Sequence, residues 1–403
     1  MENSNENLKI LFFGDLVGRP GRFAVRDFLK VAKQLGSQAA KSDNREILQI
    51  SIRHCEEGVR GQEGFSEGVA EDSRSALICR QTNLVSGWQS RPTDIKSDNL
   101  ESGKCHFESD KSDESDRSDK SITKSCYGEM CQQILTDKDL SPYRPIALSP
   151  DNSYTSIPPN LHTSFIIANV ENASHGFGLT EKNYNDLSEY GVDCMTSGNH
   201  IWDKKEIFNY IDKAEKLIRP FNYPEGTQGK GSRVFELSDG TKIAVINALG
   251  RVFMSPVESQ WSCVAEEIKR LKEITPIVIV DFHAEATAEK ICFAKFCAEL
   301  GVSAFFGTHT HVQTADEQIM NNMAYITDAG FCGTQESVIG MDYKSSLNRF
   351  TTVIPERYDV AVGNVVQINA VEVEIDKTSG HAVAIKRIFL LADKNKKEEE
   401  NER

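Results

Sequence analysis

The sequence predicts an α/β fold, and three observations lead to this prediction. Short apolar runs alternate with amphipathic runs along much of the 403 residues, a pattern typical of sheets covered by helices. An apolar content of 39% is enough for a substantial core in a chain of this length. Polar side chains also follow directly after several apolar runs, which is where open α/β sheets keep their ligand sites.

The first strand is expected at residues 8–14, LKILFFG, and a helix is expected after the turn that follows it. Residues 16–35 place apolar side chains such as Phe23 and Phe28 at helical spacing. The next apolar run, SFIIANVEN at residues 164–172, begins far beyond the few residues that usually connect a helix to a strand. An insertion is therefore expected between the two.

Residues 37–162 are Ser-rich, charged and poorly periodic, with ESDKSDESDRSDKSITKS as the extreme stretch. This composition is typical of disordered segments, and a surface loop accommodates such an insertion at modest entropic cost. We expect residues 1–36 and 163–392 to form a single domain. The insertion at 37–162 is expected to be largely disordered, and residues 393–403 to form a charged tail.

After the insertion, runs with strand-like and helix-like patterns alternate. Strands are expected at residues 164–172, 192–198, 242–250, 275–283, 302–309 and 323–330. Helices are expected at residues 180–191, 203–217, 264–274 and 287–301. Two final strands, at 362–376 and 381–391, are expected to be joined by a turn.

Composition and charge exclude some classes of partner. A formal charge of -14 argues against binding to duplex nucleic acid, which needs clustered Lys and Arg. No stretch approaches 18 continuous apolar residues, so no membrane span is expected, and the N-terminus lacks the basic flank of an export signal. Ten Cys without regular spacing are better interpreted as reduced thiols. A cytoplasmic protein is the expectation.

Metal-capable side chains follow five of the expected strands. An Asp at a strand end is usually a turn or helix-cap residue, and an isolated His is usually structural. Five successive strand ends with such residues favour a metal cluster, because a parallel sheet brings the ends of its strands into one crevice. The candidate residues are Asp15, Glu171, Asn172, Asn199, His200, His283, His309 and His311.

The types of ligand narrow the chemistry. Imidazole nitrogen with carboxylate and amide oxygen, and no Cys at these positions, suits iron, manganese, zinc or cobalt. A carboxylate able to bridge, with enough ligands for two ions, indicates a binuclear centre. Two metal ions would hold a bridging hydroxide and neutralise phosphate oxygens during in-line attack. The pattern therefore predicts phosphoester hydrolysis.

The motifs ILFFGDLVGRPGR, ANVENASHGFGLTEK, SGNHIWDKKEIF, DFHAEATAEK, GTHTHVQTADE and YITDAG together resemble the calcineurin-like metallophosphoesterase superfamily, and more closely its bacterial YmdB branch. The resemblance covers nearly the whole chain outside the insertion. It implies a layered αββα sandwich with the site at the carboxyl ends of the strands. It also implies hydrolysis of phosphodiesters, with 2',3'-cyclic nucleotides as the favoured substrates, and a homo-oligomer.

The resemblance also implies a role for each candidate residue. Iron is the first expectation for the two metal ions, with manganese or another transition metal as the alternative. His200 is implied to stabilise the transition state or to protonate the leaving oxygen, a role that suits its side-chain chemistry. The implied ligands are Asp15, Asn172 and His311 for one ion, Asn199, His283 and His309 for the other, and Glu171 as the bridge.

Two further residues lie within the second of these motifs. His175, in a Gly-containing loop, is a candidate for contact with substrate. Val170 stands where the YmdB branch commonly has Gly, so the backbone next to Glu171 could differ. Two other functions stay open: a phosphomonoesterase that uses the same centre, and a regulatory protein that binds metal or nucleotide with little turnover.

Overall fold

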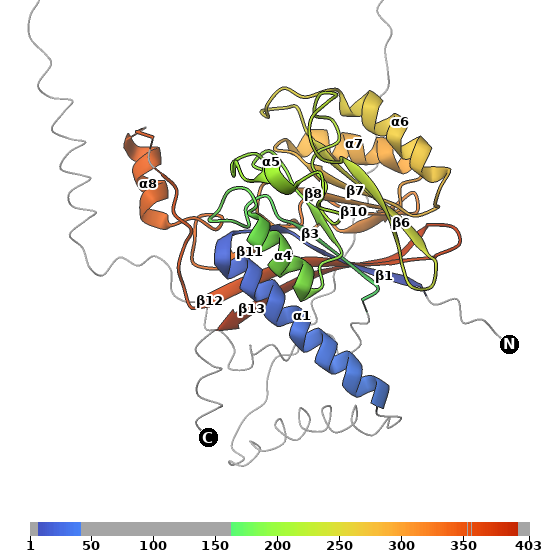
Figure 1. Cartoon of the computed structure of the whole chain (residues 1–403), viewed down its shortest axis with the longest axis horizontal. Helices are drawn as coiled ribbons and strands as arrows, with labels where there is room; N and C mark the ends of the chain where they lie inside the picture. Colours follow the sequence, from blue (N-terminus) through green and yellow to red (C-terminus); the bar gives the residue numbers. More distant parts are fainter. Residues whose placement is uncertain (1–6, 42–162, 353, 356, 394–403) are drawn as a thin grey trace, which may run out of the picture. The chain divides into compact units, whose positions relative to one another are not determined.

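The computed structural model describes residues 7–352 except 42–162, together with residues 354, 355 and 357–393. These residues form two β-sheets and six helices (Figure 1). The predicted low-complexity insertion and charged tail lie almost wholly outside the described residues, so the proposed domain boundaries stay predictions.

The first sheet has seven strands among the described residues and mixes parallel with antiparallel pairs. β1, β3 and β4 run parallel to one another, which puts their carboxyl ends at the same edge. The long strands β12 and β13 form an antiparallel hairpin on the other side of β1, as the sequence predicted. The strands are β1 (Leu8–Phe13), β2 (Asp15–Leu16), β3 (Phe165–Asn169), β4 (Cys194–Thr196), β11 (Phe331–Thr334), β12 (Val365–Ile375) and β13 (Ala382–Asp393).

The second sheet has six strands among the described residues, in the order β5-β6-β7-β8-β10-β9. Its four central strands are parallel, and an antiparallel strand closes each edge. The central strands are buried along nearly their whole length, as expected for parallel strands covered on both faces. The strands are β5 (Ser232–Glu236), β6 (Lys242–Leu249), β7 (Val278–His283), β8 (Ala304–Thr308), β9 (Gln318–Met320) and β10 (Met323–Ile326).

Helices cover the outer face of each sheet, as Figure 1 shows for α1 and α4 on one side and α6 and α7 on the other. Most of these helices are amphipathic. In α4, Thr180 caps the amino end, and Gly191 ends the helix with a positive φ that favours Gly. The helices are α1 (Gly18–Lys41), α4 (Glu181–Tyr190), α5 (Ile207–Tyr210), α6 (Gln260–Lys272), α7 (Thr287–Glu299) and α8 (Tyr343–Thr352).

Contacts between aromatic rings connect the layers. Phe12 of β1 lies against Phe306 of β8 between the two sheets, with 4.3 Å between ring centroids. Phe13 points to the opposite face, as alternation along a strand requires, and meets Phe28 of α1. Phe282 of β7 packs against α7 in the same way. The layers are therefore helix, sheet, sheet, helix, which confirms the predicted αββα sandwich.

Three local expectations differ from the structure. The predicted helix at 203–217 is reduced to α5, because residues 216–218 pair with the backbone of Met195 in β4 and draw the chain back to the sheet edge. Helix α1 ends at Lys41, five residues beyond the expected end of its domain segment. The strands β2, β5, β9 and β11 and the helix α8 were not predicted, since most are short and α8 has little burial.

No helix in the described part of the chain has the length and apolar character needed to cross a membrane. The cytoplasmic location stays a prediction.

Candidate metal centre

The candidate metal ligands come together where the carboxyl ends of the two sheets meet. Three of the strands that carry them belong to the first sheet and two belong to the second. Because the strands within each set are parallel, residues distant in the sequence lie on neighbouring loops. The residues are Asp15 after β1, Glu171 and Asn172 after β3, Asn199 and His200 after β4, His283 at the end of β7, and His309 and His311 after β8.

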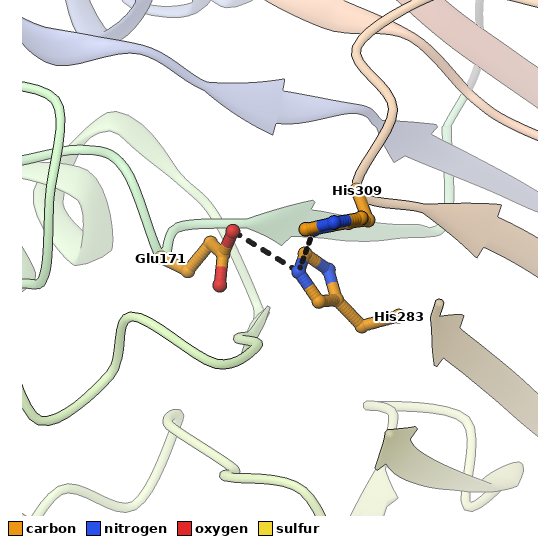
Figure 2. A group of neighbouring side chains, drawn as sticks. All are labelled: Glu171, His283 and His309. Carbon is orange, nitrogen blue, oxygen red and sulfur yellow. Dashed lines mark hydrogen bonds and ion pairs between the residues drawn. The ribbon is translucent and has the colours of Figure 1, made fainter. Parts of the chain in front are cut away.

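One group of ligand atoms surrounds a single nitrogen of His283 (Figure 2). The Nε2 atom of His283 lies 3.0 Å from Oε1 of Glu171 and 3.0 Å from Nδ1 of His309. Oδ1 of Asn199 lies 3.1 Å from the same nitrogen. His283 and Glu171 are buried. Four strand ends, those of β3, β4, β7 and β8, thus place four potential donors around one point.

A second group shares Glu171 with the first. Ligand atoms of Asp15, Glu171 and His311 all lie within 4.8 Å of one another, and all three side chains are buried. Oδ1 of Asn172 lies 3.2 Å from Nε2 of His311. The amide group of Asn172 donates to the carbonyl of Gly176, which orients its oxygen towards the histidine. The carboxylate of Glu171 thus stands between two clusters of donors.

Hydrogen bonds on the far side of His283 determine which ring nitrogen carries the proton. The hydroxyl of Thr308 donates to Asp281, at 2.7 Å. Having only one hydrogen, this hydroxyl accepts from Nδ1 of His283, at 2.9 Å. The proton of a neutral His283 is then on Nδ1, and the lone pair of Nε2 points into the centre. Ligating histidines are commonly oriented by a partner on the other nitrogen in this way.

The other two histidines follow the same rule. His311 donates through Nδ1 to the carbonyl of Ile339, at 2.8 Å, which leaves the lone pair of Nε2 facing Asn172. His309 pairs through Nε2 with Glu285, at 3.0 Å, which leaves the lone pair of Nδ1 facing His283. Each imidazole therefore presents one lone pair to the centre.

The arrangement fits metal ions better than it fits a protein interior without them. Lone pairs of neutral imidazoles, amides and carboxylates repel one another at about 3 Å unless a cation or proton lies between them. Oδ1 of Asp15 is buried without a hydrogen-bond partner, and burial raises the pKa of this carboxyl well above its usual range. Burial also opposes charge on His283, but Glu171 and Asp15 outweigh it and raise its pKa to about 9. The site thus favours positive charge at its centre.

The comparisons with known proteins agree with this geometry. The family model described as YmdB-like protein matches residues 152–388, more than half of the chain. The chain belongs to the YmdB-like family. A relative from Bacillus subtilis, named 2',3'-cyclic-nucleotide 2'-phosphodiesterase, is 45% identical over 230 residues, which is 57% of this chain and 86% of the relative.

Solved structures show the fold of this YmdB-like chain. A protein of Thermus thermophilus described as hypothetical has a TM-score of 0.59 at 24% identity, with 96% of this chain and all of that chain covered. A protein of Mycoplasma pneumoniae described as a novel phosphatase has the same TM-score at 23% identity, with 98% and 97% covered. At these identities the likeness concerns the fold alone.

His200 of the YmdB-like chain stands beside both groups. Its backbone N–H donates to Oε2 of Glu171 at 3.0 Å. Its side chain is part-exposed, and Nδ1 lies 2.9 Å from a carboxylate oxygen of Asp203. The Asp203 carboxylate can therefore orient the ring.

Val170 and His175, the two further residues noted in the sequence, both lie within the described part of the chain. Val170 is buried in the core beneath α1 and α4, and its φ is not positive, so no glycine is required next to Glu171. His175 is exposed on its loop and has a φ of 59°. It is not among the described residues that line the cavity at the centre, and its contact with substrate stays a prediction.

Several supporting residues of the YmdB-like chain were not identified from the sequence. Thr308 and Asp281 lie inside ordinary strand patterns, and Glu285 lies in a loop. The buried pair Lys290 and Asp328 holds the GTHTH loop, because Asp328 accepts from the backbone and hydroxyl of Thr310. A lysine at helical spacing with the apolar residues Phe293, Ala294 and Cys297 was the one available signal.

A cavity of about 370 Å³ opens next to the centre. One part of its lining is polar and includes Glu171, His200 and His309. Another part is aromatic and includes Phe177, Phe350 and Tyr358. The cavity is large enough for a small organic phosphate.

Proposed function

We propose that this chain hydrolyses 2',3'-cyclic nucleotides with two bound metal ions and that His200 protonates the leaving oxygen. The observation that supports this most is the position of Glu171 in both donor groups, at the end of a cavity that His200 also lines. The relative from Bacillus subtilis, at 45% identity, carries the name of this activity.

The donor sets divide between two ions. Asp15, Asn172 and His311 would hold one, Asn199, His283 and His309 would hold the other, and Glu171 would contact both. Bound metal ions supply charge that neutralises phosphate oxygens and make an activated water available at neutral pH. A set of nitrogen and oxygen donors without thiolate suits iron first and manganese second. Elemental analysis of protein purified without added metal tests this order.

The reaction adds water to phosphorus and breaks the bond from phosphorus to the 2' oxygen. The single product is a nucleoside 3'-phosphate, whose 2' oxygen leaves phosphorus and takes up a proton to become a hydroxyl. His200 would deliver that proton, and two observations support this role: it lines the cavity, and its Nδ1 contacts the carboxylate of Asp203.

The decisive experiment compares the wild-type protein with His200→Ala, both reconstituted with iron or manganese. We expect metal-dependent hydrolysis of 2',3'-cyclic AMP, and a fall of about 100- to 10,000-fold in kcat for the variant with unchanged metal content. The exposed His381 provides a matched control, because His381→Ala should keep full activity.

Two outcomes would contradict the proposal. Faster hydrolysis of adenosine 3'-monophosphate than of the cyclic diester would make the protein a phosphomonoesterase. No turnover of either ester by protein that holds two metal ions would favour a regulatory protein that binds metal or nucleotide. We further propose a homo-oligomer that works in the cytoplasm, and light scattering tests the oligomer.

A further inference from the structure

We propose that the aromatic side of the cavity, formed by Phe177, Phe350 and Tyr358, is a subsite that stacks the nucleobase of the substrate and accepts different bases. This inference rests on the proposed function, because it assigns the part of the cavity that the phosphate does not need. It makes Tyr358 and Phe350 determinants of specificity for nucleotides over other small phosphodiesters.

The cavity has a polar part and an apolar, aromatic part. The proposed substrate likewise has a polar phosphate and a flat aromatic base. The polar part, with His200 and His309 beside Glu171, suits a phosphate. The rest of the lining includes Ile339 and Met341 as well as the three aromatic rings. An apolar wall contributes little to binding a phosphate or a ribose, which are strongly hydrated. A flat aromatic base is the part of a nucleotide that matches such a wall.

The aromatic rings form a row that begins at the proposed proton donor. The centroid of the Phe177 ring lies 4.8 Å from that of His200, with the rings at 69°. The same Phe177 centroid lies 6.3 Å from that of Tyr358, at 37°. The row therefore leads away from the phosphate end, which is the direction in which the sugar and base of a bound nucleotide must extend.

At the outer end of the aromatic wall, the ring of Tyr358 contacts a neighbouring side chain, and the ring of Phe350 is exposed to solvent. The guanidinium of Arg349 lies 4.6 Å from the centroid of the Tyr358 ring, a cation–π contact that holds this ring in place. Phe350 of α8 lines the same cavity and is 72% exposed. A base stacked in the cavity would cover part of this large apolar surface, which is otherwise in contact with water.

The wall favours stacking over recognition of base edges. Ser346 lies in the lining beside Phe350, but its hydroxyl donates to the carbonyl of Asp342 at 2.7 Å. Stacking on aromatic rings tolerates every base, because every base has a π-face. We therefore expect adenine, guanine, cytosine and uracil to be accepted, with purines favoured by their larger stacking area.

The test compares two substrates that differ only in the base: 2',3'-cyclic AMP and ribose 2',3'-cyclic monophosphate. The variants are Tyr358→Ala and Phe350→Ala, with Tyr358→Phe as the conservative variant that keeps an aromatic ring. Phe253→Ala is the control, because Phe253 is 89% exposed and is not in the described lining of the cavity. Circular dichroism and metal content are measured for each protein.

We expect each alanine variant to raise KM for 2',3'-cyclic AMP by about tenfold, with little change in kcat and none in the hydrolysis of the baseless substrate. Tyr358→Phe should raise KM for 2',3'-cyclic AMP much less than Tyr358→Ala does, because it keeps the aromatic ring, and Phe253→Ala should behave as the wild type. Equal losses on both substrates would show that the wall supports the centre and would overturn the subsite. Unchanged KM in both alanine variants would also overturn it. Should Tyr358→Ala fail to fold, Phe350→Ala decides, because its side chain is mostly exposed.

Failure of the proposed function gives a different result. A wild-type protein that hydrolyses neither substrate contradicts the activity, and the subsite is then judged by calorimetric binding of adenosine 3'-monophosphate. Weaker binding in both alanine variants than in the Phe253→Ala control would support the subsite. Equal binding in all variants would reject it.

Discussion

The Nζ atom of Lys290 lies 2.7 Å from Oδ2 of Asp328, and both side chains are buried. The same carboxylate oxygen accepts hydrogen bonds from the backbone N–H and the hydroxyl of Thr310, at 3.0 and 2.7 Å. Thr310 stands between His309 and His311, whose φ angles of 101° and 63° are unusual for residues other than Gly. The pair therefore anchors a loop whose backbone conformation would otherwise be unfavourable.

Lys290→Met should strongly destabilise the protein, because it leaves the Asp328 carboxylate buried without its charge partner. We expect the free energy of unfolding, measured by urea denaturation, to fall by about 3 to 5 kcal/mol. Lys377→Met is the matched control, since the pair of Lys377 with Asp239 is solvent-accessible and should contribute little to the free energy of unfolding. Similar losses in the two variants would contradict a special role for the buried pair.

Thr308→Val should weaken metal binding while keeping the shape of the core. The substitution removes the acceptor for Nδ1 of His283, so the ring loses the contact that directs its lone pair into the centre. We expect metal affinity, measured by competition with a chelator, to fall by about 10- to 100-fold. Thr275→Val controls for loss of a buried hydroxyl, because Thr275 donates to Lys242 away from the candidate ligands. Unchanged affinity in Thr308→Val would show that Thr308 does not orient the ligand.

His283→Ala and His309→Ala should each lower the bound metal from about two ions towards one, because both residues contribute to the same donor group. Elemental analysis of the purified variants measures the change, and the exposed His381 offers His381→Ala as the control. Retention of both ions in either variant would contradict its assignment as a ligand.

Glu285→Gln should weaken binding of the same metal ion, but by less than the two alanine substitutions do. The carboxylate of Glu285 pairs with Nε2 of His309 and orients its other nitrogen, but this carboxylate is half exposed. We expect the weaker of the two metal dissociation constants to rise by about tenfold, at the lower end of such effects. Isothermal titration with Mn²⁺ tests this beside Glu299→Gln, at the far end of α7. Equal metal affinities for the two variants would show that Glu285 does not contribute to the metal centre.

The sequence predicted most of the fold and the converging residues for one physical reason. Parallel strands that are buried on both faces are read as continuous apolar runs, and their carboxyl ends meet at one edge. Polar residues that follow such runs, such as Asp15 and His283, could therefore be assigned to one site without knowledge of the strand order. The prediction of a helix at 203–217 was wrong, because helical propensity there competes with pairing of residues 216–218 to β4.

The sequence alone thus determined which residue types lie at the strand ends. Those residue types indicated a site with nitrogen and oxygen donors. Tertiary structure decided what the pattern cannot express: which lone pair each imidazole directs inwards, and which partners direct it. Thr308 orients His283 and Glu285 orients His309 because non-neighbouring segments pack together, and Phe177 and Tyr358, 181 positions apart, meet in one cavity. Such contacts depend on distances and angles in three dimensions, which local periodicity and residue type do not specify.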